Sequence, residues 1–337
     1  MPKQRTWSTF GAIRRLPSEY EVVTHSTDWT SRVGASAPLE VNPDSPENLW
    51  LRTYRNGSPF HVADWTRFRD PDEMTYRKYV TVQDDAETAI EGILVEFEDG
   101  ELWERPWADV LLRFFTPQRY LAHGLQMAEI YLTQMAPHSY VKNCGAFAAA
   151  DLLRLNTWVS YRTEMLRRLV PDVGFTERER SIWETDPAWQ GVREAIERLL
   201  LAYDFGECFV ATNLVLAPAL SELLLSIFAE IARGANDDLS WLLLGKLMDD
   251  AERRARWSAA AALYAVKERE GNAPVIAEWA DEWGALADRA VLDIATEFSQ
   301  LAIKVPSADD LLERTRQVRL GMLPGAMTSP TSVGPQQ

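Results

Sequence analysis

The pattern of apolar positions predicts a helical hairpin between residues 116 and 168. In its first half, apolar residues recur at intervals of three or four, which places them along one face of a helix. They are Leu121, Leu125, Ala128, Leu132 and Met135. Thr116-Pro117 is typical of a capping hydroxyl followed by proline at the first helical position. Ala136-Pro137 is expected to end this helix.

The second half of the hairpin combines aromatic residues with an acid and a base. Intervals of three and four relate Phe147, Asp151, Arg154, Trp158, Tyr161 and Met165. Their position inside an aromatic stripe favours burial of Asp151 and Arg154, and buried charges need partners.

Apolar residues continue at helical spacing over most of the remaining chain. Further helices are expected at residues 74–82, 85–96, 103–115, 177–183, 187–203, 205–231, 238–270, 274–303 and 309–320. Asp70-Pro71-Asp72 predicts another capped helix start, and no run alternates as a strand does. The sequence therefore predicts an all-α protein with a helical domain over residues 66–320. Residues 321–337, rich in Pro, Gly, Ser, Thr and Gln, are expected to form a disordered tail.

Residues 1–65 differ from the rest, because the prolines at positions 17, 38, 43, 46 and 59 interrupt any long helix while many aromatic residues remain. So many aromatic side chains are expected to be buried against another protein surface. Two interpretations are open: the segment packs on the chain's own helices, or it is an extended arm that contacts a partner subunit. Tryptophan, tyrosine and arginine are enriched at interface hot spots. The candidate anchors are Trp7, Arg14, Arg15, Tyr20, Trp29 and Trp50.

Composition narrows the possible functions. The chain has 337 residues, 46% of them hydrophobic, and a formal net charge of −15, which argues against binding nucleic acid. Cys144 and Cys208 are too few for a disulfide framework or a zinc motif. No apolar run approaches the roughly 18 to 20 residues of a membrane span, and the first residues lack an export signal. We expect a reduced, soluble, cytoplasmic protein.

The four histidines exclude the best-known metal site of helical bundles. A carboxylate-bridged di-iron or di-manganese site needs two Glu-x-x-His pairs and two further carboxylates. No glutamate stands three residues before His25, His61, His123 or His138. A single histidine of this kind is more often a core or surface residue than a ligand. The sequence also lacks a P-loop, a dinucleotide-binding glycine pattern, His-Glu-x-x-His and Gly-x-Ser-x-Gly.

Two Asp-x-x-Arg pairs nevertheless stand where a metal-binding bundle would place Glu-x-x-His. Asp151 and Arg154 lie on one long predicted helix, and Asp250 and Arg253 lie on another. Arginine has no free lone pair and stays protonated, so its charge replaces that of a metal ion. The other interpretation is an ordinary surface pair at this common spacing. Glu207 and Gln126 are the candidates for the remaining two positions of such a vestigial site.

Several short stretches, in order and spacing, carry a resemblance to a known family. They are Arg14 to Thr24, Phe68 to Asp72, Tyr76-Arg77, Thr116 to Leu121, Leu125 to Met127, Asn143-Cys144, Tyr161 to Thr163, Pro171 to Phe175, Asp186 to Gly191 and Asp250 to Trp257. Through them the chain resembles the β subunit of the hydroxylase component of bacterial soluble multicomponent di-iron monooxygenases, of the toluene, alkene and isoprene type.

The resemblance implies a ferritin-like helical subunit without metal or cofactor of its own. It implies an obligate catalytic α subunit that holds the di-iron centre, a second αβ protomer, and in some complexes a γ subunit. Electrons from NADH would come through a reductase, in some types through a Rieske ferredoxin, and a coupling protein would dock on the hydroxylase. It also implies that the N-terminal arm reaches over the α subunit. The substrate would be a small hydrocarbon set by the pocket of the other chain.

Two alternatives belong to other classes of protein. Asp84-Asp85-Ala-Glu-Thr88 and Asn236-Asp237 superficially resemble the metal-binding motifs of class I terpenoid synthases. Thr88 and Leu244 stand where those motifs need carboxylates, so the magnesium ions could not be held. The other alternative is a stand-alone helical adaptor.

Overall fold

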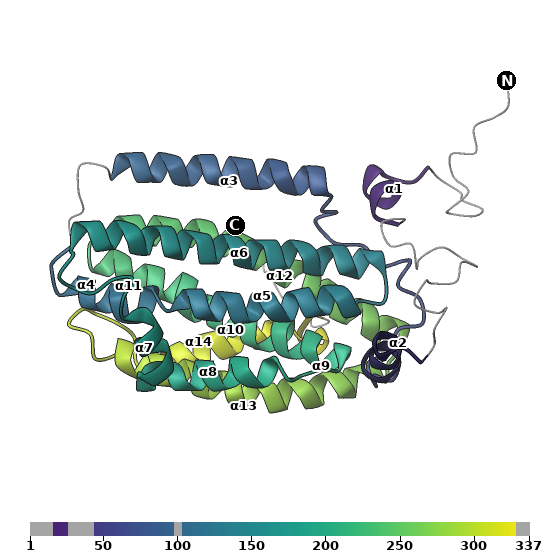
Figure 1. The fold of residues 1–337 in the computed structure, drawn as a ribbon. Helices are drawn as coiled ribbons and strands as arrows, with labels where there is room; N and C mark the ends of the chain where they lie inside the picture. The colour runs from purple at the N-terminus through teal and green to yellow at the C-terminus, as the bar shows by residue number, and fades with distance from the viewer. Residues whose placement is uncertain (1–15, 26–43, 98–102, 328–337) are drawn as a thin grey trace, which may run out of the picture.

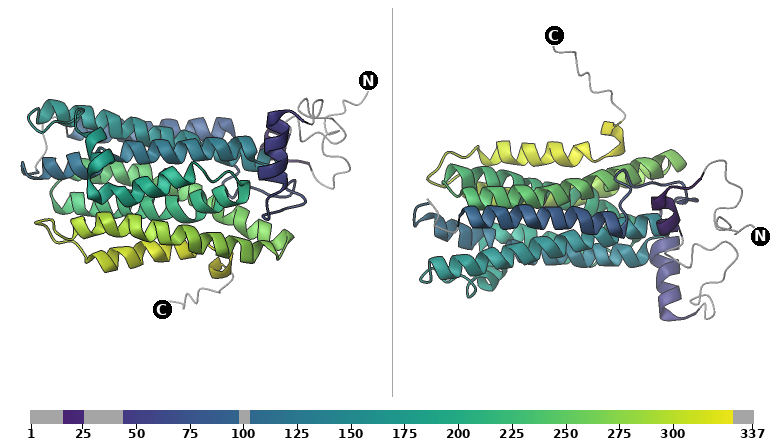
Figure 2. Two further views of the ribbon diagram at one scale, coloured as in Figure 1. Left: turned by 60° about the horizontal axis from the view of Figure 1, so that its bottom comes forward. Right: turned by 90° about the horizontal axis from the view of Figure 1, so that it is seen from above.

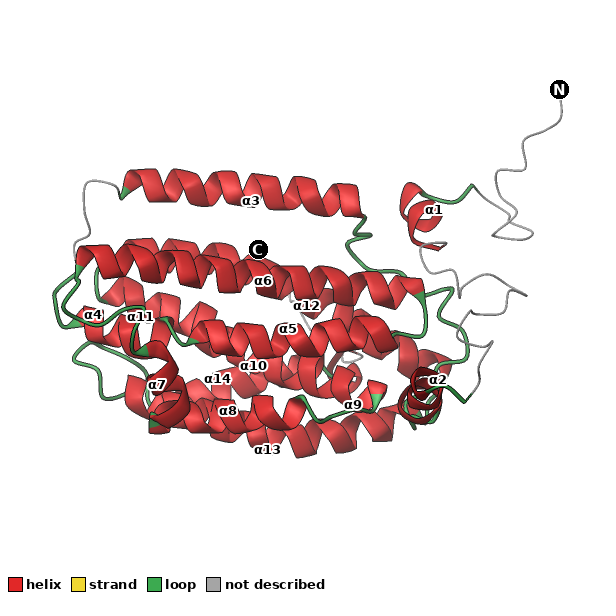
Figure 3. Ribbon diagram, viewed as in Figure 1, coloured by secondary structure: helices red, strands yellow, loops and turns green. Residues whose placement is uncertain are grey.

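The computed structural model describes residues 16–25, 44–97 and 103–327, and within these ranges it contains helices and no strand (Figure 3). The predicted all-α fold is therefore confirmed. The long helices lie side by side with their axes roughly parallel and form one elongated bundle (Figure 1).

The predicted hairpin consists of α5 (Gln118–Met135) and α6 (Ser139–Leu169). All five apolar residues of the stripe predicted for α5 are buried. The capping role predicted for Thr116 is wrong, because its hydroxyl donates to the Leu112 carbonyl at 2.7 Å. The chain before it is already helical in α4 (Trp107–Val110) and η5 (Leu111–Phe115), so no free helix end exists at Thr116.

The centre of the bundle is a continuous helical stretch built from α9 (Phe205–Phe209), η6 (Val210–Leu216), α10 (Ala217–Ser221), η7 (Glu222–Ile227) and α11 (Phe228–Gly234). The wider π turns of η6 and η7 flank the segment containing Pro218, which cannot donate a helical hydrogen bond. By length and composition this stretch could cross a membrane, contrary to the sequence prediction, but 83% of its apolar window is buried inside the fold.

The remaining helices complete the bundle. They are α7 (Glu179–Thr185), α8 (Pro187–Leu199), α12 (Asp238–Glu268), α13 (Asn272–Phe298), α14 (Ala308–Gly321) and α15 (Pro324–Met327). Asp186 caps α8 by accepting a hydrogen bond from the Ala188 amide, as the sequence suggests. At Gly191 a side chain would lie 2.9 Å from the Ala290 Cα, so glycine permits close packing of α8 on α13. The disordered tail predicted from residue 321 is wrong for residues 321–327, and residues 328–337 lie outside the described ranges.

One long helix, α3 (Tyr76–Glu96), lies outside the bundle against α6 and α12 (Figures 1 and 2). It replaces the two shorter helices predicted there. Its N-cap is Thr75 rather than Asp70, because Asp70 accepts hydrogen bonds from the Asp72 and Met74 amides in a preceding turn. Glu73 has φ 43° in this turn.

The N-terminal region contains α1 (Glu19–His25), α2 (Pro46–Leu51) and η4 (Arg52–Asn56). Phe60 and Trp65 are buried in the chain's own core. Tyr20 is buried too, with its ring centroid 5.6 Å from that of Tyr140, so the anchor role predicted for it is not supported. Trp50 is partly exposed and donates to the Tyr131 hydroxyl at 2.9 Å. Among the other predicted anchors, Trp7, Arg14, Arg15 and Trp29 lie outside the described residues.

A candidate vestigial metal centre

The two Asp-x-x-Arg pairs meet inside the bundle, where α6 and α12 face each other. Asp151 and Asp250 are 3% and 6% exposed. Arg253 is also buried, and 9% of the Arg154 side chain is exposed. The long helical stripes thus bring four charged groups from two distant segments into one buried cluster.

The ion pairs cross between the helices. Arg154 Nη1 lies 2.5 Å from Asp250 Oδ2, and Arg253 Nη2 donates to Asp151 Oδ1. Arg253 also lies 3.0 Å from Asp250 Oδ1 on its own helix. Arginine is long enough to bridge the 8–10 Å between packed helix axes, so each guanidinium reaches the carboxylate of the other helix. The pairs therefore join α6 to α12.

Helix α3 completes the cluster with three side chains that the sequence analysis missed. The Tyr79 hydroxyl donates to Asp151 at 2.8 Å. The Gln83 amide donates to both aspartates, at 3.1 and 3.0 Å. Glu87 accepts from Arg154 Nε at 2.5 Å. Positions 79, 83 and 87 recur at intervals of four, so this polar face was visible in the sequence, although its partners were not.

Burial and neighbouring negative charge shift the pKa values of groups in this cluster. Burial, together with the nearby Asp250 carboxylate, raises the pKa of Asp151 to about 6, although Arg253 opposes the shift. Burial beside Asp151 also raises the pKa of Tyr79, so this hydroxyl stays protonated as a donor.

A second buried polar group lies deeper in the bundle. It consists of Glu129 from α5, Asn213 from η6, and Arg254 and Ser258 from α12. Ser258 donates to Asn213 Oδ1 at 3.1 Å, and Arg254 donates to the Ser221 hydroxyl at 3.1 Å. Within the described residues, neither carboxyl oxygen of Glu129 has a hydrogen-bond partner. Burial raises the pKa of Glu129 to about 8, against the charge of Arg254 and the polar side chain of Asn213.

Gln126 and Glu207 do not occupy the positions predicted for them. Gln126 is partly exposed and lies 3.3 Å from the His123 ring, and Glu207 accepts from Trp283 Nε1 at 3.2 Å. Their helical segments supply Glu129 and Asn213 instead. The sequence pattern could not distinguish Gln126 from Glu129, because both lie on α5 within one turn.

The arrangement is suited to holding helices together rather than to binding a cation. Over the described ranges, no group of three or more His, Cys, Asp and Glu side chains could hold a metal ion. The positive charges inside the cluster are guanidinium groups, which have no lone pair to offer. Asp237, part of the terpenoid synthase-like motif, is buried as the N-cap of α12 and accepts from Trp107 Nε1 at 2.8 Å.

The helical-bundle fold is that of a hydroxylase subunit. A family model described as "Methane/Phenol/Alkene Hydroxylase" matches residues 50–269, and the chain belongs to this family. It is 38% identical to the β subunit of the hydroxylase component of the toluene-4-monooxygenase system of Ectopseudomonas mendocina, over 95% of this chain and 97% of that one. The resemblance seen in the sequence is confirmed, and the comparisons support neither alternative.

Solved structures agree with this assignment. A chain of toluene 4-monooxygenase, solved with toluene bound in its resting active site, superimposes with a TM-score of 0.81 at 39% identity. The match covers 85% of this chain and 95% of that one. A phenol hydroxylase chain from Pseudomonas sp. OX1 gives a TM-score of 0.78 at 18% identity, over 91% and 90% of the two chains, which supports the fold alone.

The crossed ion pairs predict a large loss of stability when one shared acceptor is removed. Asp250→Ala leaves Arg154 and Arg253 buried without their common carboxylate, so the free energy of unfolding is expected to fall by about 3–5 kcal/mol. Asp249→Ala is the matched control, because the neighbouring Asp249 side chain is 65% exposed and forms an ion pair with Lys246 on its own helix. It is expected to change stability by about 1 kcal/mol or less. Denaturant unfolding measures both variants, and equal losses would contradict a buried network.

The raised pKa of Glu129 predicts that the free energy of unfolding depends on pH. Its folded-state pKa of about 8 lies above the usual unfolded value, so the folded state binds the proton more tightly. Its contribution is fully present below about pH 4.3, the unfolded pKa, and is lost as the pH rises to about 8. Glu129→Gln removes this titration. As the pH rises from 5 to 7, the free energy of unfolding of the variant is therefore expected to increase by roughly 2–3 kcal/mol relative to that of the unmodified chain. If the free energies of unfolding of the variant and the unmodified chain changed in parallel from pH 5 to pH 8, the predicted titration of Glu129 would be refuted.

Proposed function

We propose that the chain is the non-catalytic β subunit of a multicomponent monooxygenase hydroxylase. Its role is to support a catalytic α subunit that holds the di-iron centre and oxidises a small alkene, isoprene or aromatic hydrocarbon with O₂. The observation that carries this proposal is the cluster of Asp151, Arg154, Asp250 and Arg253, which fills the interior of the bundle with the chain's own cations. The similarity to a toluene monooxygenase β subunit supports an aromatic substrate for the complex.

The proposal includes the partners of such a complex. They are the α subunit, a second αβ protomer, a γ subunit where the complex has one, a coupling protein, and a reductase with or without a ferredoxin that delivers electrons from NADH. A cytoplasmic location suits a reaction that draws on NADH. The net charge of −15 is consistent with protein partners rather than nucleic acid.

The location of iron tests the proposal. The chain is coexpressed with its catalytic α subunit, the complex is purified, and the separated chains are analysed for iron. Iron is expected to follow the α subunit, because guanidinium groups occupy the interior of this bundle. The chain expressed alone is the control and is expected to contain no stoichiometric iron. Stoichiometric iron bound through Asp151 or Asp250 would overturn the proposal.

The N-terminal arm is a further part of the proposed assembly. Deleting residues 1–15 removes Trp7, Arg14 and Arg15 while leaving the buried Tyr20 in place. If these anchors contact the α subunit, the shortened chain is expected to retain less α subunit on copurification, since each buried tryptophan contributes about 1.5–3 kcal/mol. Deletion of residues 328–337 is the matched control. Equal retention of the α subunit by both deletion variants would sink the arm hypothesis.

A further inference from the structure

Helix α3 has two faces of different character. One face supplies Tyr79, Gln83 and Glu87 to the buried cluster. Yet Ile90 is the one buried residue among the 21 of this helix. Seen from above, α3 runs lengthwise along the outside of the bundle beside α6 and α12 and has no further layer of described helices over it (Figure 2). A helix that its own chain buries so little is a candidate for burial against another chain.

Exposed apolar side chains gather beside this helix. More than half of the large exposed apolar residues in the described ranges lie on or next to α1, α3 and α6. On α6, Leu153 and Tyr161 are 51% and 53% exposed. Together with Ala150 and Thr157 they form one uncharged stripe, since the four positions are three or four residues apart. Apolar surface concentrated in this way marks an interaction site.

This α6 stripe forms the wall of a groove. The groove has a volume of about 360 Å³ and is bordered by Glu87 of α3. Arg154 and Trp158 line it, so the buried ion cluster reaches the surface there. Within the described residues, Arg154 Nη2 has no hydrogen-bond partner although it is buried. An occupant of the groove is therefore expected to supply an oxygen acceptor as well as an apolar surface.

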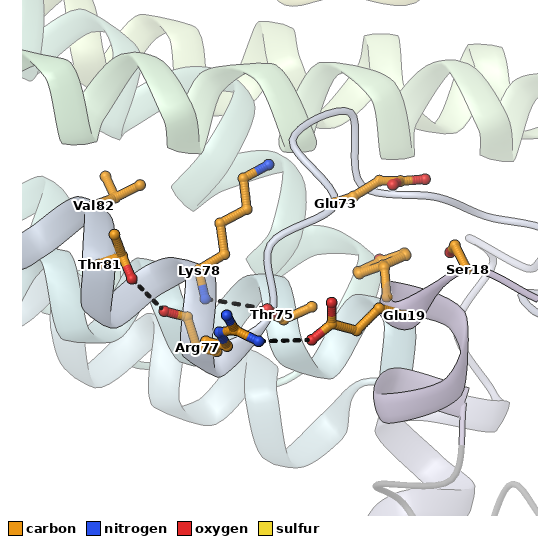
Figure 4. A pocket seen from close by; sticks show the side chains of 9 residues that line it. Ser18, Glu19, Glu73, Thr75, Arg77, Lys78, Thr81 and Val82 are labelled. Carbon is orange, nitrogen blue, oxygen red and sulfur yellow. Dashed lines mark hydrogen bonds and ion pairs between the residues drawn. The ribbon is translucent and has the colours of Figure 1, made fainter.

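The distribution of charge along α3 indicates which charges the partner carries. After Lys78, the helix carries five acidic residues and no basic one: Asp84, Asp85, Glu87, Glu91 and Glu96. At its other end, α3 meets α1 around an open hollow of about 360 Å³ where Arg77 and Lys78 stand near Glu19 and Glu73 (Figure 4). Complementarity to the acidic half of α3 requires a partner with basic residues there. The other end of α3, which carries charges of both signs, fixes the orientation of the partner.

We propose that α3 and the α6 stripe form the docking face for the catalytic subunit. The occupant is an apolar helix of the α subunit, with basic residues against the acidic half of α3 and an oxygen acceptor for Arg154. This inference rests on the proposed function, because it assigns the surface to the same partner. The internal ion cluster then positions α3 for assembly.

Leu153→Glu tests this docking face, because it places a charge in the middle of the stripe. The variant, coexpressed with the α subunit, is expected to bind it at least about tenfold more weakly. Leu320→Glu is the matched control: Leu320 is 46% exposed on α14, on another side of the bundle, and is expected to leave binding unchanged (Figure 2). Circular dichroism and thermal unfolding of both variants show whether the fold is intact. Undiminished binding by a folded Leu153→Glu chain would overturn the docking face.

A photo-cross-linking amino acid at position 157 gives a measurement independent of folding defects. In the intact complex it is expected to cross-link to a helix of the α subunit. Cross-links to a second copy of this chain, a γ subunit or the coupling protein instead would overturn the assignment. If the unmodified chain does not bind the α subunit at all, the proposed function fails. If it binds and the cross-link lies elsewhere, only the docking face fails.

Discussion

The ion cluster between α3, α6 and α12 is the interaction on which the arrangement of these helices depends. Removing a charged group from water costs several kcal/mol, and a buried pair offsets this cost only when geometry and further hydrogen bonds are good. Here Asp250 accepts from both Arg154 and Arg253, and Gln83 adds a neutral donor. Because each arginine reaches the other helix, sliding α6 along α12 would break both pairs. The cluster therefore fixes the register of the two helices.

The same cluster accounts for the division of labour that we propose within the complex. A metal site in a helical bundle needs converging lone pairs, and arginine offers none. The deeper group does not restore one, because burial raises the pKa of Glu129 and Arg254 stands beside it as a further fixed cation. The bundle of this family is retained, while its interior serves the packing of helices. This suits a subunit whose role is structural.

Helix α3 connects this interior to the outer surface. Its Tyr79, Gln83 and Glu87 side chains are held by the cluster, so the opposite face is presented in a defined position. Little apolar burial holds α3 to its own chain, since only Ile90 is buried. Its position depends on these polar contacts and on a few apolar ones, such as the stacking of the Tyr79 ring on Phe147 with centroids 4.7 Å apart. Burial against a partner would add further apolar contacts. Internal stability and assembly are coupled through this one helix.

The sequence by itself determined the features that depend on local spacing and composition. The apolar stripe of α5, the Asp186 cap and the Asp-x-x-Arg spacing are of this kind, because helical periodicity and capping act over a few residues. The tertiary structure decided the rest. Only packing brought Arg154 to Asp250, 96 positions away, and buried the polar side chain of Glu129 rather than that of Gln126. Such contacts join distant segments, and no local pattern records which face of one helix meets which face of another.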